Sequence, residues 1–332
     1  MDLAHCAVLA AALLGWADIT IQPSRGDRVQ TTWQRTVGAM DRPGERTIET
    51  LRRYDLERRY RHDVDGVLAS LYQAARANPD PDVVYALAEL SWLEGRRLDR
   101  RRRAEAIDRY VDAGAYAYDF LFDPELADGR QPSDPRFRMA CDLYNASLDR
   151  LIRAVKSKAP IEPGGRRITI RIHGREHTLV VELSNSPWTA DDVDELLMAS
   201  DFEVSGLPTR TYQYGLGVPL IGVRRNDHPG QGDQRFYPGE MAFPLTGFLR
   251  PNSRLRDPES PEGEARPCTI ELIDPVRVPA VGRAPTIMPV EADITTPLAY
   301  MWSRTDLGKI RWTGLLRPGE VADRTGLMLL RP

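Results

Sequence analysis

The sequence is poor in the residues that build the commonest catalytic centres. Its 332 residues include 3 cysteines and 5 histidines, and no Cys-x-x-Cys spacing suggests a zinc site. It also lacks a Gly-x-Ser-x-Gly pentapeptide, the turn on which α/β-hydrolases place their serine nucleophile. We therefore expect no catalytic residue, no cofactor and no metal in this chain.

Charge of one sign is also missing. The chain carries 45 basic and 48 acidic residues, a net charge of −3, so it lacks the basic surplus of a nucleic-acid-binding protein. With 42% hydrophobic and 28% charged residues it has the composition of an ordinary globular protein. We expect no nucleic-acid partner.

Long hydrophobic runs are absent as well. The apolar run Cys6–Trp16 is too short to cross a bilayer but has the length of a signal-peptide core. It predicts a signal peptide over residues 1–20 and an exported protein. No basic residue precedes the run, which leaves a buried N-terminal helix as the alternative.

Cys141 and Cys268 would form a disulfide only if their Cα atoms came within about 7 Å.

From residue 28 to about 158, apolar residues recur at helical spacing. The alternation of small and aromatic residues in Tyr85–Leu90 and Ala113–Tyr118 is typical of helical-hairpin repeats. At most two hairpins fit, so we expect a compact irregular bundle with TPR-like hairpins. The predicted helices run from Asp63 to Asn78, from Asp80 or Asp82 to the Gly95 region, from Arg103 to Phe122, and from Asp134 to Lys158, the last with Pro135 in its first turn.

After Pro160 the pattern changes to short alternating strands with proline-rich connections. The predicted class is therefore α+β, with a helical domain over 28–159 and an antiparallel β-rich domain over 160–332. A hairpin is predicted from Ile168–His173 and His177–Leu183, turning at Gly174–Glu176. A helix over Ala190–Ala199, capped by Thr189, and exposed loops over 224–238 and 251–267 are also predicted. The other predicted strands are Phe202–Val204, Val218–Val223, Met241–Leu249, Thr269–Ile273 and Leu298–Trp302.

Candidate polar residues fit structural roles better than catalysis. Asn145 and Asp142 lie in an aromatic-rich apolar stretch, where we expect them to bond loop backbone. Gly215-Leu-Gly217 lacks the third glycine of a nucleotide fingerprint and predicts a tight turn before a strand. The other serine candidates are Ser184 and Ser186, which lack flanking glycines, and Ser205, which has a glycine on one side only. The histidine candidates are His173 and His177, a hairpin pair without a third metal ligand, and the isolated His62 and His228. The acidic candidates are Asp191, Asp192, Asp194 and Glu195, the first of which suit a helix N-terminus.

An arginine-rich stretch is the strongest local charge feature. Arg96, Arg97 and Arg100–Arg103 predict either contact with anionic lipid or acidic polymer or a solvated helix end. Asp99, Glu105 and Asp108 in the same stretch favour the solvated alternative.

Five stretches together resemble the N-terminal region of bacterial exported α/β-hydrolases: Arg53–Leu56, Tyr85–Trp92, Ala115–Phe122, Asp134–Asn145 and Gly215–Leu220. The resemblance implies a helical and a β-rich segment that precede a hydrolase domain, with its esterase-like serine triad. The chain ends at Thr325–Pro332, about where that domain would begin, so no catalytic residue carries over.

The hypothesis is therefore a non-catalytic accessory region. Its partner would be an α/β-hydrolase catalytic domain in the same polypeptide or in a separate chain, with membrane-surface contact as a further partner. The alternative is a free-standing helical and β interaction protein of the cell envelope. Members of the family resemble lipoproteins whose anchoring cysteine would fall at Trp16, a departure that argues against lipid anchoring here.

Overall fold

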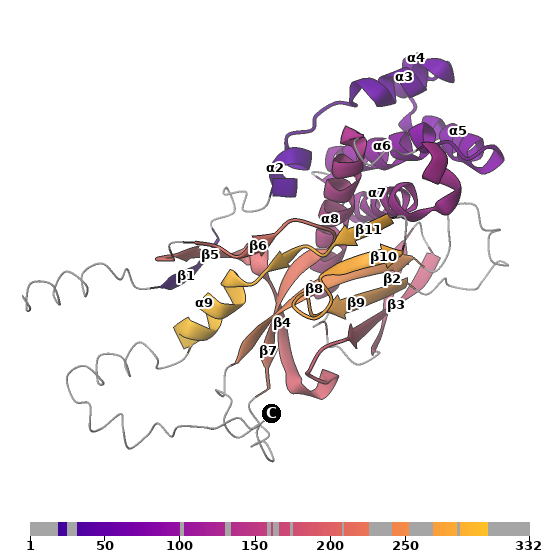
Figure 1. The fold of residues 1–332 in the computed structure, drawn as a ribbon. Coiled ribbons are helices and arrows are strands. Elements are labelled where there is room, and N and C mark those ends of the chain that lie inside the picture. The colour runs from indigo at the N-terminus through magenta and orange to yellow at the C-terminus, as the bar shows by residue number, and fades with distance from the viewer. Residues whose placement is uncertain are drawn as a thin grey trace, which may run out of the picture.

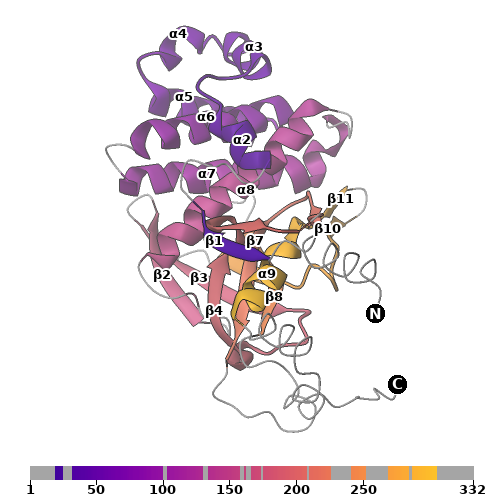
Figure 2. The same cartoon turned by 90° about the vertical axis from the view of Figure 1, so that its left-hand side faces the viewer.

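The chain is described by a computed structural model that covers residues 19–24, 32–99, 103–129, 134–157, 161, 166–172, 175–207, 209–225, 241–251, 268–283 and 286–304. A stack of helices covers one face of a six-stranded sheet, and helix α9 (Thr295–Arg304) lies on the other face (Figures 1 and 2). The predicted α+β class is confirmed.

Four long helices build the helical layer, and three of them begin where an aspartate side chain accepts from a free N–H group of the first turn. The four are α5 (Val64–Ala77), α6 (Pro81–Asp99), α7 (Arg103–Phe122) and α8 (Pro135–Lys156). The Asp63 carboxylate caps α5 at 2.8 Å, and the Asp134 carboxylate caps α8 at 2.9 Å. Asp80 accepts from the N–H of Asp82 at 2.8 Å and so begins α6. These helices lie where the sequence predicted them.

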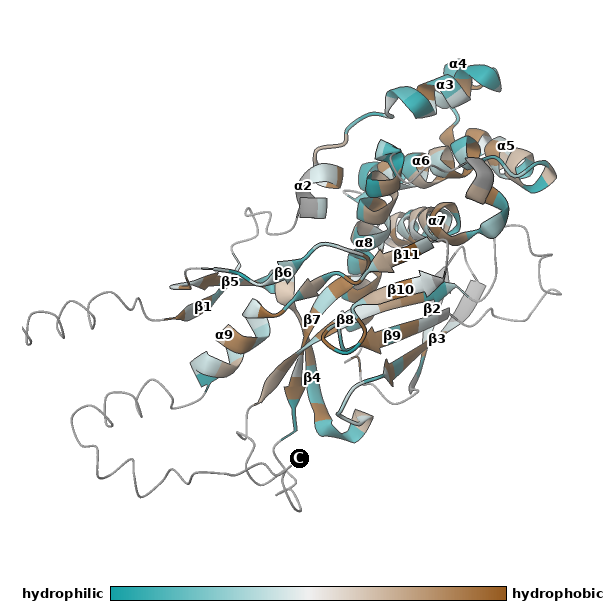
Figure 3. Ribbon diagram, viewed as in Figure 1, coloured by the Kyte–Doolittle hydropathy of each residue, from teal (hydrophilic) through white to brown (hydrophobic). Residues whose placement is uncertain are grey.

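Shorter elements complete the helical layer: α2 (Thr32–Gly38), α3 (Glu45–Arg53), α4 (Glu57–Tyr60) and the 3-10 turn η1 (Pro124–Gly129). The outermost helix, α4, is mostly hydrophilic in Figure 3. This agrees with its four residues, none of which is buried.

The sheet has the strand order β2-β3-β9-β8-β7-β4 and is antiparallel except for the parallel pair β3–β9. Its strands are β2 (Arg166–Ile172), β3 (Arg175–Ser184), β4 (Val193–Met198), β7 (Val218–Arg224), β8 (Ala242–Pro251) and β9 (Cys268–Ile273). Three two-stranded pairs accompany it: β1 (Thr20–Pro23) with β5 (Phe202–Ser205), β6 (Tyr212–Gln213) with β12 (Ala292–Asp293), and β10 (Ala280–Arg283) with β11 (Thr286–Pro289). The predicted hairpin and the predicted strands near residues 202, 218, 241 and 269 are confirmed.

Two predictions of secondary structure are wrong. The helix expected over Ala190–Ala199 is a single 3-10 turn, η2 (Ala190–Asp192), followed by β4 and by a second 3-10 turn, η3 (Ala199–Asp201). Pairing of β4 with β7 supplies its backbone with partners, and this tertiary contact outweighs helix propensity. The strand expected over Leu298–Trp302 is part of α9, because the Asp293 carboxylate accepts from Thr296 and starts a helix there.

Helices and sheet share one continuous hydrophobic core. Tyr118 and Phe122 of α7, Tyr144 of α8 and Phe248 of β8 meet with ring centroids 4.8–6.5 Å apart. The aromatic side chains of α7 and α8 therefore form a common core that extends into the sheet. The polypeptide passes from helix to strand between Lys156 and Arg166, near the predicted boundary. Independent folding of 28–159 and 160–332 stays a prediction.

Candidate functional site

A buried asparagine of α8 holds the loop between β6 and β7. The Asn145 side chain is fully buried. Its amide nitrogen donates to the carbonyl oxygen of Gly215 at 3.0 Å, and its amide oxygen accepts from the N–H of Gly217 at 2.7 Å. The prediction that Asn145 bonds loop backbone is thereby confirmed. Asp142 instead pairs with Arg138 at 3.2 Å, so the same prediction is wrong for Asp142.

The loop itself needs glycine at two positions. Gly217 has φ +111°, a left-handed conformation that other residues rarely adopt. A Cβ at Gly215 would lie 2.2 Å from the carbonyl oxygen of Pro289. The predicted tight turn before the strand β7 is therefore confirmed, and it lies against the end of β11.

Glu291 is a buried acid that the sequence did not single out. Its side chain has no exposed surface. One carboxylate oxygen accepts from the Tyr212 hydroxyl and the other from the N–H of Gly215, both at 2.5 Å. Burial raises the pKa of Glu291 to about 7, although both hydrogen bonds and Arg138 oppose the shift. The sequence signal that could have identified Glu291 is an acidic residue between two apolar residues, Val290 and Ala292, both of which are buried in the structure.

A cleft of about 330 Å³ opens beside this buried group, between the start of α8, the β6–β7 loop and β11. Its lining is Asp134, Pro135, Phe137, Arg138, Cys141, Tyr214, Gly215, Met288 and Pro289. The Tyr214 side chain is 51% exposed, and the Arg138 guanidinium lies 5.6 Å from the centre of its ring. The wall is therefore mainly apolar, with one acidic and one basic group at hand.

This cleft does not hold an activated nucleophile among its described lining residues. Burial raises the pKa of the Cys141 thiol to about 12, so the sulfur stays protonated at neutral pH. Both oxygens of Glu291 are already bonded to protein groups, and no part of that side chain reaches solvent. The arrangement suits the binding of an apolar group rather than proton or acyl transfer.

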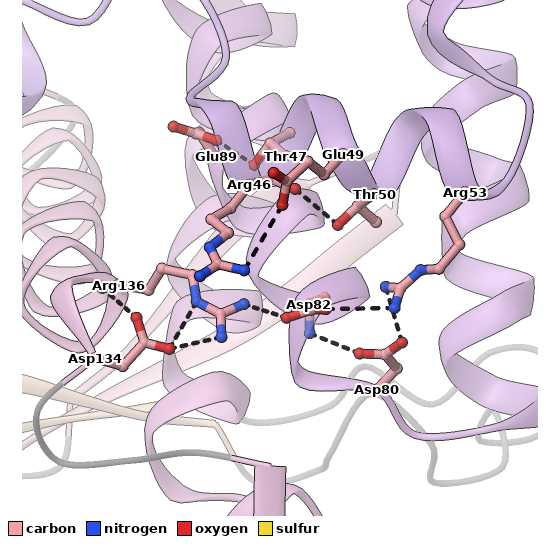
Figure 4. Close-up of polar contacts among 10 residues, drawn as sticks. All are labelled: Arg46, Thr47, Glu49, Thr50, Arg53, Asp80, Asp82, Glu89, Asp134 and Arg136. Carbon is pink, nitrogen blue, oxygen red and sulfur yellow. Dashed lines mark hydrogen bonds and ion pairs between the residues drawn. The ribbon is translucent and has the colours of Figure 1, made fainter.

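A second polar cluster joins α3, α6 and α8 (Figure 4). Arg53 pairs with Asp80 at 3.0 Å and with Asp82 at 3.4 Å, and Arg136 lies between Asp82 and Asp134. The hydrogen bond from Arg136 lowers the pKa of Asp134. Each of these three aspartates has a basic partner from the protein, so the cluster joins the C-terminal end of α3 to the N-terminal ends of α6 and α8.

The other sequence candidates do not converge on a site. The Ser186 hydroxyl accepts from the N–H of Trp188 at 3.1 Å, and Ser205 ends β5 on the surface. The strand register places His177 opposite Ile170 rather than opposite His173, which lies outside the described residues together with His228. His62 is exposed. No group of three metal-ligating side chains occurs within the described ranges.

The acidic stretch before β4 has a turn function. The Asp192 carboxylate accepts from the N–H and the hydroxyl of Thr189 at 2.8 and 2.7 Å. Asp194 and Glu195 are exposed on the edge strand β4, where no helix N-terminus exists. Asp191 and Asp192 lie in the first turn of the 3-10 turn η2, whose N-cap is the predicted Thr189, so the helix-end explanation holds for these first two acids. It does not apply to Asp194 and Glu195, which belong to a strand.

The arginine-rich stretch is described only in part. Arg96 and Arg97 lie in the last turn of α6, and Arg103 begins α7; Arg100–Arg102 lie outside the described residues. Among the helices that the structure describes, none is long and apolar enough to cross a membrane.

Comparisons of the chain with protein-family models, curated proteins and solved structures find no match in any of the three.

Proposed function

We propose that this chain is the non-catalytic accessory region of an exported α/β-hydrolase whose serine triad lies outside it. The resemblance of five sequence stretches supports the proposal. The observation that carries it is the cleft beside Glu291: the polar groups beneath it hold backbone, while its wall is apolar and open to solvent. Concave apolar surfaces of this kind accept side chains of another protein domain.

The docking surface in this proposal is centred on Tyr214. Its ring is 51% exposed, and Ile287, next to the cleft residue Met288, is 62% exposed. A large aromatic side chain supported by a stacked arginine is a common anchor of protein interfaces. A catalytic domain that covers this surface would gain hydrophobic contact without any change in the buried groups below.

The test uses the gene product extended through the coding sequence downstream, which the proposal expects to contain the hydrolase domain. Tyr214→Ser and Ile287→Ser should lower the temperature at which esterase activity is lost, because docking is weakened. Leu298→Ser is the matched control, since Leu298 is 48% exposed on α9 and does not line the cleft. Equal effects of all three substitutions would contradict the docking surface.

Helical hairpins of the TPR type are a further part of the proposal. A Cβ at Gly95 would lie 2.8 Å from the Tyr110 ring, and one at Gly114 would lie 3.1 Å from Cβ of Ser147. Glycine thus permits close approach of α6 to α7 and of α7 to α8, as small residues do in helical-hairpin repeats. This spacing supports a hairpin-based scaffold.

Export is also proposed, with Cys6–Trp16 as the core of a signal peptide over residues 1–20. The run Cys6–Trp16 lies before Ile19, the first residue that the structure describes. N-terminal sequencing of the protein from its native host tests the idea. A mature N-terminus near residue 20 supports export, and an intact N-terminus in the cytosolic fraction contradicts it.

A free-standing interaction protein is the second candidate. One observation favours it: β2 forms an edge of the six-stranded sheet and pairs on one side with β3. Such an edge can accept an extended segment of another protein by strand addition. The two candidates differ in the esterase activity of the extended gene product, which only the hydrolase proposal expects.

A further inference from the structure

A long groove lies along the helical layer, away from the cleft beside Glu291. It consists of two adjoining cavities of about 690 and 610 Å³ that share Arg96, Arg150 and Arg153. Arg96 comes from the last turn of α6, and the other two come from successive turns of α8. The groove and the cleft share no lining residue, so a ligand in the groove would bind independently of the proposed hydrolase partner.

Most of the charged groups in the groove neutralise one another. Arg150 pairs with Asp99 at 3.2 Å. Arg153 pairs with Asp149 at 3.0 Å and with Asp201 at 2.7 Å. Arg97, which lines the larger cavity, pairs with Glu94. These ion pairs hold the walls in place and leave little free charge.

Arg96 differs from these arginines. Its hydrogen bonds all use Nη1, which donates to the carbonyl oxygens of Met40 and Val37. Within the described part of the chain, no carboxylate lies within 4.0 Å of its guanidinium. Asp41 lines the same cavity but is exposed, so water screens its charge. The groove therefore places a half-buried cation, with Nε and Nη2 available, where its two cavities meet.

The larger cavity also has an apolar wall. Met40, Leu93 and Ile107 line it beside the arginines. Arg150 lies over the ring of Tyr110 at 5.4 Å, which keeps that guanidinium against the wall. A ligand that fits this surface needs an oxyanion for Arg96 and a hydrocarbon segment for the apolar side chains.

We propose that this groove binds an anionic amphiphile, with its phosphate or carboxylate on Arg96 and its acyl chain along Met40, Leu93 and Ile107. The guanidinium fork matches the oxygen geometry of both head groups. The source of the ligand is either a membrane phospholipid or a soluble single-chain lipid, and both present the same chemistry to the groove. Binding from a membrane would make this face the contact surface with the bilayer.

Calorimetric titration with monomeric oleoyl lysophosphatidate tests the proposal. The wild-type chain should bind it. Arg96→Ala should weaken binding about tenfold or more, because a charge-assisted hydrogen bond is lost. Arg96→Lys retains the charge and should bind with intermediate affinity. Arg76→Ala is the matched control, because Arg76 is an exposed arginine on α5 that stacks on Tyr72 and lies outside the groove.

Ile107→Ser supplies a second variant that leaves every arginine in place. This substitution should lower the affinity for lysophosphatidate, whose acyl chain contacts Ile107. Inorganic phosphate has no acyl chain and should bind only weakly, with the same affinity in the wild type and in Ile107→Ser. Sedimentation with vesicles of phosphatidylglycerol and phosphatidylcholine in equal parts identifies the source. Arg96-dependent binding to these vesicles, and not to pure phosphatidylcholine, assigns the ligand to the membrane; binding of the monomer alone assigns it to a soluble lipid.

Three results would overturn the proposal. The first is no binding of lysophosphatidate by the wild-type chain. The second is equal affinity in the wild type and in Arg96→Ala. The third is equal affinity for neutral mono-oleoylglycerol, since the head group would then contribute nothing.

Discussion

Replacing Glu291 by glutamine should change how the stability of the protein depends on pH. The carboxylate is fully buried, with one oxygen bonded to the Tyr212 hydroxyl and the other to the N–H of Gly215. An amide fits the same space: its oxygen accepts from Gly215, and its NH₂ group donates to the Tyr212 oxygen. The substitution therefore removes a titrating charge and keeps two hydrogen bonds.

The size of the effect depends on the pKa shift. Burial raises the pKa of Glu291 from 4.5 to about 7. Because the folded state binds the proton more tightly, this group favours folding below pH 4.5, and the contribution is lost as pH rises through 7. A shift of this size corresponds to about 3 kcal/mol. The stability difference between wild type and Glu291→Gln should change by that amount between pH 4.5 and 8, in favour of the variant at pH 8.

Urea denaturation at both pH values measures the difference directly. Glu57→Gln is a control of opposite sign, because a hydrogen bond from Arg52 lowers the pKa of the exposed Glu57. The Glu57 contribution is present at pH 8 and is lost as pH falls, so that variant should lose stability at pH 8. A Glu291→Gln variant whose stability differs from wild type by the same amount at both pH values would refute the reasoning.

Three further substitutions test the junction of helices and sheet, each by urea denaturation. Tyr144→Phe should cost about 3 kcal/mol, because the hydroxyl bonds both the carbonyl at 2.6 Å and the N–H at 2.8 Å of Leu249, which stay buried without it. Gly217→Ala should cost about 2 kcal/mol or more through its positive φ, whereas Gly38→Ala, with open space around it, should be nearly neutral. Asn145→Ala should cost about 2 kcal/mol by leaving two buried groups of the β6–β7 loop without partners. An unchanged free energy of unfolding in Tyr144→Phe or in Asn145→Ala would contradict the hydrogen bonds of that residue. Equal losses of stability in Gly217→Ala and Gly38→Ala would contradict the role of the positive φ at Gly217.

The elements that the sequence predicted are those whose signals lie within a few residues. Asp63 and Asp134 cap helices through bonds to their own first turns, and Pro135 follows directly. The start of α9 carried a similar signal in Asp293 and Pro297, which the apolar stretch after it concealed. Local chemistry is visible in a sequence because its partners are adjacent.

The elements that the sequence did not predict depend on distant partners. Residues Val193–Met198 have a helix-forming composition, yet pairing with β7 makes them an edge strand. Glu291 takes its hydrogen bonds from residues 79 and 76 positions earlier. Arg96 is one arginine among six in its stretch of sequence, and only the fold shows that none of the described carboxylates lies within 4.0 Å of its guanidinium.

The central claim is that the 332-residue chain supports a catalytic domain and does not itself catalyse ester hydrolysis. Its most direct test is turnover of 4-nitrophenyl butyrate by this chain alone and by the product extended through the downstream coding sequence. The account predicts activity in the extended product alone, abolished there by a serine-directed phosphonate. Phosphonate-sensitive turnover by the 332-residue chain, or an inactive extended product, would contradict it.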